Sequence, residues 1–279
     1  MPLHNLAIRS ITGFFFGTVI ILSCFAPLLW QILIYGFIMV LGLREFISFF
    51  KADSTIQIDV VSAYFLQILI YGIISCTYFF EIRPALLWVF VPIIFLVFLN
   101  ELWRNIGHPI LNISLLVFGI GYTLVPFLLI IMLGNLSEEK HLNFPLVLGM
   151  YLLIWTNDTF AYFSGSLFGK KALFSRISPK KTWEGTIGGV LFSIIVGLIL
   201  AWTTNELTLT FWLVSALIIA PTAIFGDLLE SLFKRSVNLK DSGSILPGHG
   251  GILDRFDALI FTVPFYYFWS LFYLEFIAL

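Results

Sequence analysis

The sequence predicts an all-α, polytopic integral membrane protein with about nine transmembrane helices and a cytoplasmic N-terminus. Of its 279 residues, 59% are hydrophobic and only 11% are charged, whereas soluble domains carry about 25% charged residues. The hydrophobic residues form continuous runs, and a helix needs about 20 such residues to cross a bilayer. These runs lack the alternating pattern of about ten residues that builds a membrane β-barrel.

Nine apolar runs divide the chain, and Ala26 and Pro27 predict a tight turn between the first two. The fourth and fifth runs are the least regular, because prolines, glycines and charged residues interrupt them. Membrane helices tolerate such residues when neighbouring groups satisfy the freed backbone. We expect helices at residues 11–26, 28–49, 60–80, 86–102, 111–133, 144–165, 184–204, 209–228 and 257–277.

The first 27 residues permit two interpretations. Arg9, an apolar run and Ile-Leu-Ser-Cys at residues 21–24 are similar to a lipoprotein signal peptide. We favour a first membrane helix, because apolar runs continue to the C-terminus and leave no soluble domain to export. Cys24 and Cys76 lie within apolar runs, which is typical of packed thiols and not of a disulfide framework.

The basic residues support both the number of helices and their orientation. If the N-terminus is cytoplasmic, the loops after the second, fourth, sixth and eighth helices are cytoplasmic too. These segments hold 13 of the 15 Lys and Arg residues, and only Arg83 and Lys140 fall outside them. Cytoplasmic loops are enriched in Lys and Arg, so one helix more or fewer would break this distribution.

The first charged segment follows the sixth run. Asp158 lies near its cytoplasmic end, where a carboxylate is costly unless it pairs, binds a ligand or reaches interfacial water. Ser178 and Pro179 indicate a helix N-cap followed by proline at the first helical position, and a helix N-terminus suits a phosphate. Lys180 and Lys181 add cations, although a lysine pair here also serves as a topology signal or contacts anionic lipids.

The second charged segment, residues 226–257, holds nine of the chain's 31 charged residues. If the eighth helix continues through Ser236, four polar residues share one helical face, at spacings of three, four and seven. These residues are Asp227, Glu230, Ser231 and Lys234. A carboxylate-bearing face at the membrane edge is costly as packing, and it suits a site for a metal and phosphates.

A glycine-rich loop completes this segment. Three glycines and one proline within residues 247–251 exclude a regular helix. Such a loop lets backbone N–H groups approach an anion closely. We expect His249 and Gly250 to contact the substrate, with a structural role or general-base catalysis as alternatives for His249. Asp254 and Asp257 follow three residues apart and can point the same way.

Two carboxylate elements therefore flank a basic loop. Mg²⁺ in proteins is usually held by one or two carboxylates together with substrate phosphates. Nearby basic residues would neutralise the remaining phosphate charge, which is the main task in phosphoryl and nucleotidyl transfer. The alternative is a salt-bridged cytoplasmic loop that binds no ligand.

Motifs in about the last 125 residues resemble those of the CTP:phosphatidate cytidylyltransferases, or CDP-diacylglycerol synthases. Phe160 departs from the family pattern, which has a small residue there, and the first five runs match only in hydropathy. The matching stretches are Asp158-Thr-x-Ala-Tyr162, Ser178-Pro-x-Lys-Thr-Trp-Glu-Gly185, Gly226-Asp227, Ser231-Leu-Phe-Lys-Arg235 and Lys240 to Asp257.

The resemblance implies transfer of the cytidylyl group of CTP to phosphatidate, giving CDP-diacylglycerol and pyrophosphate. It implies a homodimer in the bacterial inner membrane, with the active site facing the cytoplasm and no nucleic-acid partner. Residues 1–110 would form N-terminal membrane helices, and residues 111–279 would form the catalytic region. Mg²⁺ would bind Asp227 and Asp254, and a potassium ion could share the site.

Pattern and resemblance together give two sets of site residues. The predicted catalytic residues are Asp227, Asp254, Lys234, Arg235 and Arg255. The predicted substrate-binding residues are Asp158, Lys180, Lys181, Lys240, His249, Gly250 and Asp257.

Two other functions are compatible with an oily chain that carries such a site. A CTP-dependent polyprenol or dolichol kinase would transfer the γ-phosphoryl group and release CDP instead of pyrophosphate. A transporter would place ionisable groups near the bilayer midplane, beside paired broken helices. A CDP-alcohol phosphotransferase is disfavoured, because its dense Asp-x-x-Asp-Gly cluster is absent from the sequence.

Overall fold

A computed structural model describes residues 3–51, 53–80, 90–137, 140–204, 207–239, 241–243, 245 and 250–277. Within these residues the chain forms nine α-helices and one two-stranded antiparallel sheet. The helices are α1 (Leu3–Phe25), α2 (Leu28–Ser48), α3 (Val60–Phe79), α4 (Phe90–Arg104), α5 (Pro109–Leu133), α6 (Lys140–Phe168), α7 (Trp183–Thr203), α8 (Leu209–Ser236) and α9 (Leu253–Phe276). The strands are β1 (Ala172–Phe174) and β2 (Ser178–Thr182).

The helical membrane class predicted from the sequence is confirmed. Six of the described helices, α2, α3, α5, α7, α8 and α9, are long and apolar enough to cross a membrane. Large apolar side chains such as Phe37, Phe65, Trp202 and Phe268 are exposed on the outside of the bundle. Exposed apolar surface on this scale marks a lipid or protein contact. Nine crossings and a cytoplasmic N-terminus remain predictions.

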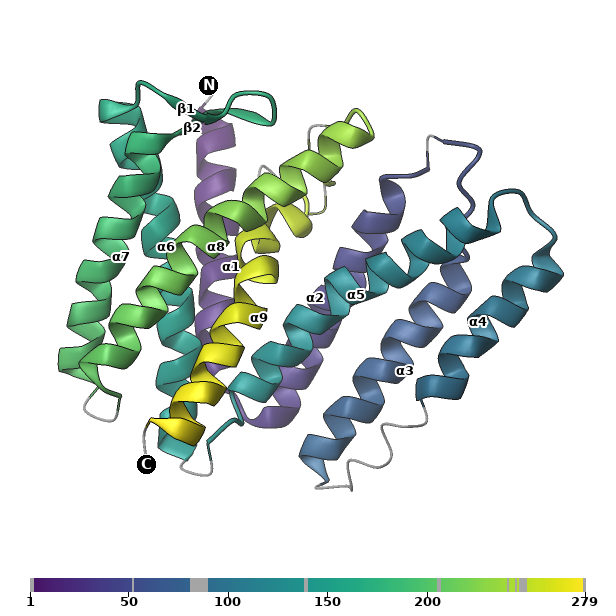
Figure 1. Cartoon of the computed structure of the whole chain (residues 1–279), viewed down its shortest axis with the longest axis horizontal. Helices are drawn as coiled ribbons and strands as arrows, with labels where there is room; N and C mark the ends of the chain where they lie inside the picture. Colours follow the sequence, from purple (N-terminus) through teal and green to yellow (C-terminus); the bar gives the residue numbers. More distant parts are fainter. Residues whose placement is uncertain are drawn as a thin grey trace.

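The helices run alternately up and down the bundle. The start of α1 lies at the same end as β1 and β2, and α9 finishes at the opposite end (Figure 1). The C-terminal ends of α2, α4, α6 and α8 also lie at the end that carries the sheet. The C-terminal ends of these four helices therefore share one end of the molecule with the sheet and with the start of α1.

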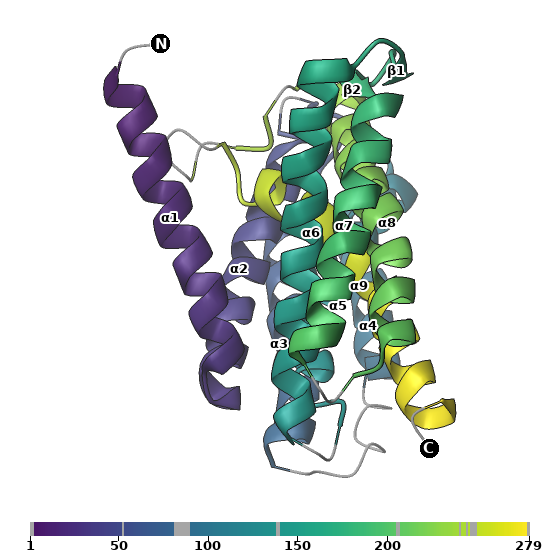
Figure 2. The same cartoon turned by 90° about the vertical axis from the view of Figure 1, so that its left-hand side faces the viewer.

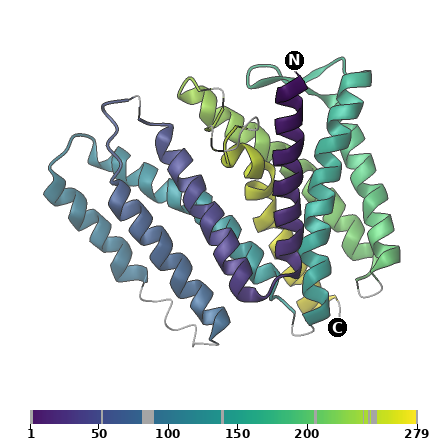
Figure 3. The same cartoon turned by 180° about the vertical axis from the view of Figure 1, so that it is seen from behind.

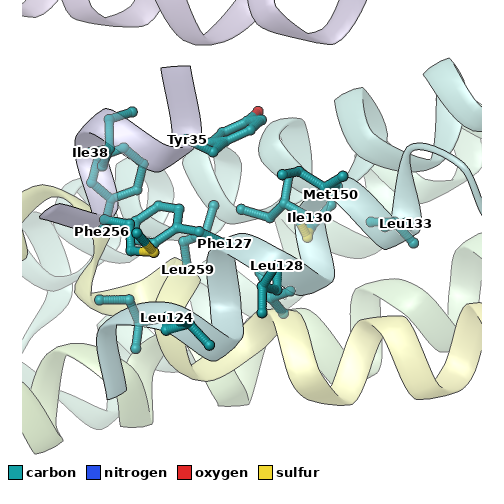
Figure 4. Packing of buried hydrophobic residues seen from close by; sticks show 14 of the residues in the cluster. Tyr35, Ile38, Leu124, Phe127, Leu128, Ile130, Leu133, Met150, Phe256 and Leu259 are labelled. Carbon is teal, nitrogen blue, oxygen red and sulfur yellow. The ribbon is translucent and has the colours of Figure 1, made fainter. Parts of the chain in front are cut away.

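Helix α5 joins two groups of helices. It packs against α2 and α3 on one side and against α9 on the other, while α6, α7, α8 and α9 pack in succession. Figure 4 shows the resulting core, in which side chains from α2, α5, α6 and α9 meet. The rings of Phe127 and Phe256 lie 5.2 Å apart, edge to face. This packing holds the start of α9 against the centre of the bundle.

Helix α1 is attached mainly through its C-terminal half. Ser23 Oγ lies 2.8 Å from Tyr35 Oη, and Tyr151 Oη donates to that same oxygen at 3.2 Å. Phe25 packs against Phe144 with ring centroids 4.2 Å apart. The N-terminal half leans away from the other helices (Figure 2), and from behind α1 lies between α2 and α6 (Figure 3).

Candidate active site

The sheet between α6 and α7 positions the first candidate lysine. Neighbouring residues of a strand point to opposite faces, so Lys180 is exposed while Lys181 reaches across to α8. Lys181 Nζ lies 2.5 Å from Asp227 Oδ2 and donates to the Ile224 carbonyl at 3.4 Å. The segment after α6 and the end of α8 are therefore in direct contact.

The predicted N-cap at Ser178 is wrong. Ser178 is the first residue of β2 and pairs with Phe174, so Pro179 lies in a strand and not in a helix. Helix α7 begins at Trp183, and its N-cap is Thr182, whose side chain accepts a hydrogen bond from Gly185 N at 3.1 Å. Both residues have side chains that can cap a helix, and pairing between β1 and β2 decides between them.

Helix α8 extends to Ser236, beyond the expected end at residue 228, and so meets the condition on which the shared polar face depended. Its polar face forms contacts between residues four apart. Ser231 Oγ donates to Asp227 Oδ1 at 3.3 Å, and Lys234 Nζ lies 2.6 Å from Glu230 Oε2. Residues at this spacing lie on one side of a helix. The acids and the lysine therefore share the face predicted from their spacing.

Lys234 also connects α8 to α9. Its Nζ lies 2.5 Å from Asp254 Oδ1, so one ammonium group bridges Glu230 and Asp254. The other oxygen of Asp254 accepts hydrogen bonds from the backbone N–H groups of Ser242, at 3.0 Å, and Gly251, at 2.8 Å. Asp254 is therefore fixed from three directions.

Gly250 lies directly over this carboxylate. Its φ angle is +83°, which glycine adopts readily and other residues rarely adopt. A Cβ at this position would lie 2.7 Å from Asp254 Oδ2. Gly250 therefore packs directly against Asp254, and the approach of the glycine-rich loop to an anionic substrate stays a prediction.

Asp158 and Asp257 complete an acidic cluster, which we define as Asp158, Asp227, Glu230, Asp254 and Asp257. The carboxyl group of Asp257 lies close enough to those of Asp158, Asp227 and Glu230 for their negative charges to repel one another. Asp158 lines a small pocket of about 40 Å³ between α1, α6 and α9, together with Arg255 and apolar residues. Even with Arg255 at its edge, the cluster holds more carboxyl groups than basic groups.

The donor chemistry of the acidic cluster fits a hard cation. Glu230 is fully buried, and its Oε1 has no hydrogen-bond partner in the part of the chain that the structure describes. No group of three or more His, Cys, Asp or Glu side chains among the described residues is arranged so that it could hold a metal ion by itself. An Mg²⁺ ion would therefore need substrate phosphates or water to complete its shell, which is its usual behaviour.

Three predicted site residues remain, namely Arg235, Lys240 and His249. Arg235 is exposed, and its guanidinium donates to the Leu239 carbonyl at 2.9 Å, away from the acidic cluster. Lys240 and His249 lie outside the described residues.

Sequence reasoning missed one buried carboxylate. Glu45 of α2 is 3% exposed, and its Oε2 accepts hydrogen bonds from Ser242 Oγ at 3.1 Å and Leu253 N at 2.9 Å. A signal was present, because an acid inside an apolar span is costly and usually functional. Its partners could not be identified from sequence, since they lie about 200 residues away.

Comparison with known proteins identifies the family. The sequence model of the Cytidylyltransferase family matches residues 7–273, which is nearly the whole chain. The chain belongs to the cytidylyltransferase family.

Individual family members agree with this assignment. The chain is 36% identical over 160 residues to the phosphatidate cytidylyltransferase of Haemophilus influenzae, covering 54% of this chain and 56% of that protein. It is 44% identical over 130 residues to that of Staphylococcus saprophyticus, covering 46% and 50%. It is 34% identical over 196 residues to that of Rickettsia bellii, covering 66% and 82%. The first two alignments span only about half the length of the relatives.

Proposed function

We propose that this cytidylyltransferase-family protein condenses CTP with phosphatidate, giving CDP-diacylglycerol and pyrophosphate. The observation that carries the proposal is the pair of ion contacts that join four motif stretches two by two. Lys181 contacts Asp227, and Lys234 contacts Asp254. The relatives named phosphatidate cytidylyltransferase support the choice of substrates.

In the proposed reaction a phosphate oxygen of phosphatidate attacks the α-phosphorus of CTP. A new P–O bond forms in line with the bond that breaks, and pyrophosphate leaves with that bond's electron pair. The attacking group needs no protein base, because a phosphate monoester has a second pKa near 6 and is largely ionised at pH 7. The protein's task is to orient two anionic substrates and to offset their charge.

The residues of the site divide this task. Asp227 and Asp254 would hold Mg²⁺, which supplies positive charge to the triphosphate when bound; a potassium ion could share the acidic cluster. Lys181 forms an ion pair with Asp227, and Lys234 forms one with Asp254. Both ammonium groups would also reach substrate phosphates bound beside these carboxylates. Arg255, next to the small pocket between α1, α6 and α9, is suited to the lipid phosphate. Lys180 of β2 and Arg235 of α8, together with Lys240 and His249, would contribute from positions around the acidic cluster.

We further propose nine membrane crossings, with the N-terminus and the acidic cluster on the cytoplasmic side of the bacterial inner membrane. The alternating helices and the basic loops at the end of the bundle with the sheet support this orientation. The acidic cluster then lies where a dissolved nucleotide and a lipid of the inner leaflet can meet. We retain a homodimer, and the division into residues 1–110 and 111–279, as predictions.

The metal-ligand assignment is tested with Asp227→Asn and Asp254→Asn in purified protein at limiting Mg²⁺. Each variant should lose about 100-fold or more of CTP-dependent CDP-lipid formation, because metal charge stabilisation is worth several kcal/mol. Asp53→Asn is the control, since Asp53 is an exposed loop residue whose side chain accepts a hydrogen bond from Thr55 N. Near wild-type rates in either site variant would refute the assignment.

A further inference from the structure

We propose that Glu45 of α2 is a positioning residue for Asp254. Its carboxylate holds Ser242 and Leu253 in the positions that place hydrogen-bond donors around Asp254. The kinetic part of this inference rests on the proposed function, and its structural part does not.

The first step is the contact itself. Glu45 lies in α2, outside the motif stretches in the last part of the chain. One oxygen, Oε2, accepts hydrogen bonds from both Ser242 Oγ and Leu253 N. Glu45 and Ser242 are 3% and 2% exposed. Hydrogen bonds to a charged group are about twice as strong as those between neutral groups, so this contact anchors Ser242 and Leu253 to α2.

The second step leads from Glu45 to Asp254. Ser242 contacts both acids, because its hydroxyl donates to Glu45 while its backbone N–H donates to Asp254 Oδ2 at 3.0 Å. The Asp254 N–H in turn donates to Ser242 Oγ at 3.3 Å. Displacement of Ser242 would remove one of the three donors that fix the Asp254 carboxylate.

The third step concerns the start of α9. The first N–H groups of a helix have no partner within the helix, and the N-cap residue of α9, Ile252, makes no side-chain capping bond. Glu45 supplies the acceptor for Leu253 N from a different helix. A negative charge at this end is also favoured by the helix dipole. Glu45 therefore fixes the turn from which Asp254 projects.

The fourth step comes from two glycines that enclose the carboxylate. A Cβ at Gly243 would lie 2.6 Å from Glu45 Oε1, and one at Gly251 would lie 2.5 Å from Glu45 Oε2 and would collide with Ser242 Oγ. Real Cβ atoms essentially never approach other atoms so closely. Close packing against Glu45 therefore explains why Gly243 and Gly251 lack side chains.

A double-mutant cycle between Glu45→Ala and Ser242→Ala tests the proposal kinetically. We expect Glu45→Ala to lower kcat by about 10–100-fold, the usual effect of removing a group that orients a ligating residue. The double variant should be no slower than the slower single variant, because both act through the same link. Losses that multiply would overturn the proposal.

Conservative replacement gives a second kinetic test. An amide oxygen at position 45 can still accept the bonds from Ser242 and Leu253, so Glu45→Gln should retain at least about tenfold more activity than Glu45→Ala. Equal losses would contradict the proposal. If Glu45→Ala does not fold, Ser242→Ala keeps the test open, since it must itself lower kcat by about tenfold or more.

Residue-resolved hydrogen exchange separates positioning from local capping. In Glu45→Ala without ligand, we expect faster exchange at Leu253 N and also at Ser242 N and Gly251 N, which donate to Asp254 and not to Glu45. Faster exchange confined to Leu253 would contradict the proposal. If Glu45→Ala does not fold, Ser242→Ala is measured instead, and faster exchange at Gly251 N is required.

The matched control is Glu101→Gln. Glu101 is also a buried carboxylate and accepts a hydrogen bond from Asn112 Nδ2 at 2.9 Å, but it lies on α4. Glu101→Gln should change neither kcat nor the rate of hydrogen exchange at Ser242 N and Gly251 N. If the wild-type protein makes no CDP-lipid, the proposed function fails, and the exchange experiment still decides the role of Glu45.

Discussion

Replacing Lys234 with methionine removes the charge that bridges α8 and α9 and keeps most of the side-chain stem. Lys234 is 8% exposed and Glu230 is fully buried. The ammonium lies 2.6 Å from Glu230 and 2.5 Å from Asp254. Asp254 would keep two backbone donors, whereas Glu230 would lose its partner. Removing one partner of a buried ion pair typically costs about 3–5 kcal/mol, so we expect a loss of this size in the free energy of unfolding.

The loss can be measured by denaturant titration of purified protein in detergent, followed by tryptophan fluorescence. The double variant Lys234→Met/Glu230→Gln provides the matched comparison, because it removes the buried charge together with its partner. Replacing both members of a buried pair is often close to neutral, so the double variant should recover most of the loss.

A Lys234→Met variant within about 1 kcal/mol of wild type would refute this reasoning, since that is the range of solvent-exposed ion pairs. A double variant less stable than Lys234→Met would also contradict it. Either result would mean that the bridge between Glu230 and Asp254 does not hold α8 and α9 together.

Two further predictions concern the packing and capping that support the site. Gly149→Ala places a Cβ against the indole of the fully buried Trp212 and should lower the free energy of unfolding by about 1–3 kcal/mol. The control Gly121→Ala has no atom within 4 Å of the new Cβ and should be neutral or stabilising. Equal losses of stability in the two variants would contradict the packing of Gly149 against Trp212. Thr182→Ala removes the hydrogen bond that Gly185 N donates to the α7 N-cap and should cost about 1 kcal/mol; unchanged stability in the same titration would contradict the assignment of that cap.

Hydropathy alone predicted most of the helical framework. The ends of the expected helices agree with those of the described helices within a few residues at most positions, as in α2 and α3. Helix α1 begins earlier, at Leu3, because a helix can extend beyond its apolar stretch. Helix α8 ends at Ser236 and not at the expected residue 228, because the polar residues beyond 228 continue at helical spacing.

The sequence was less informative where tertiary contacts decide the local structure and the partners of a side chain. Ser178 and Thr182 are both plausible caps, and only the pairing of β1 with β2 distinguishes them. The motif lysines suggested phosphate ligands, yet Lys181 and Lys234 also neutralise Asp227 and Asp254. The contact between Glu45 and the segment before α9 joins residues about 200 positions apart, and no local pattern reports a contact of that range.

The most direct test of the proposed chemistry follows each phosphorus atom of CTP during turnover with phosphatidate in detergent. With Mg²⁺ present, we predict that a label at the α-phosphorus enters the lipid and a label at the γ-phosphorus leaves as pyrophosphate, one for each CDP-lipid formed. Transfer of the γ-label to a lipid with release of CDP would contradict the account, as would uptake of substrate into proteoliposomes without any turnover of CTP.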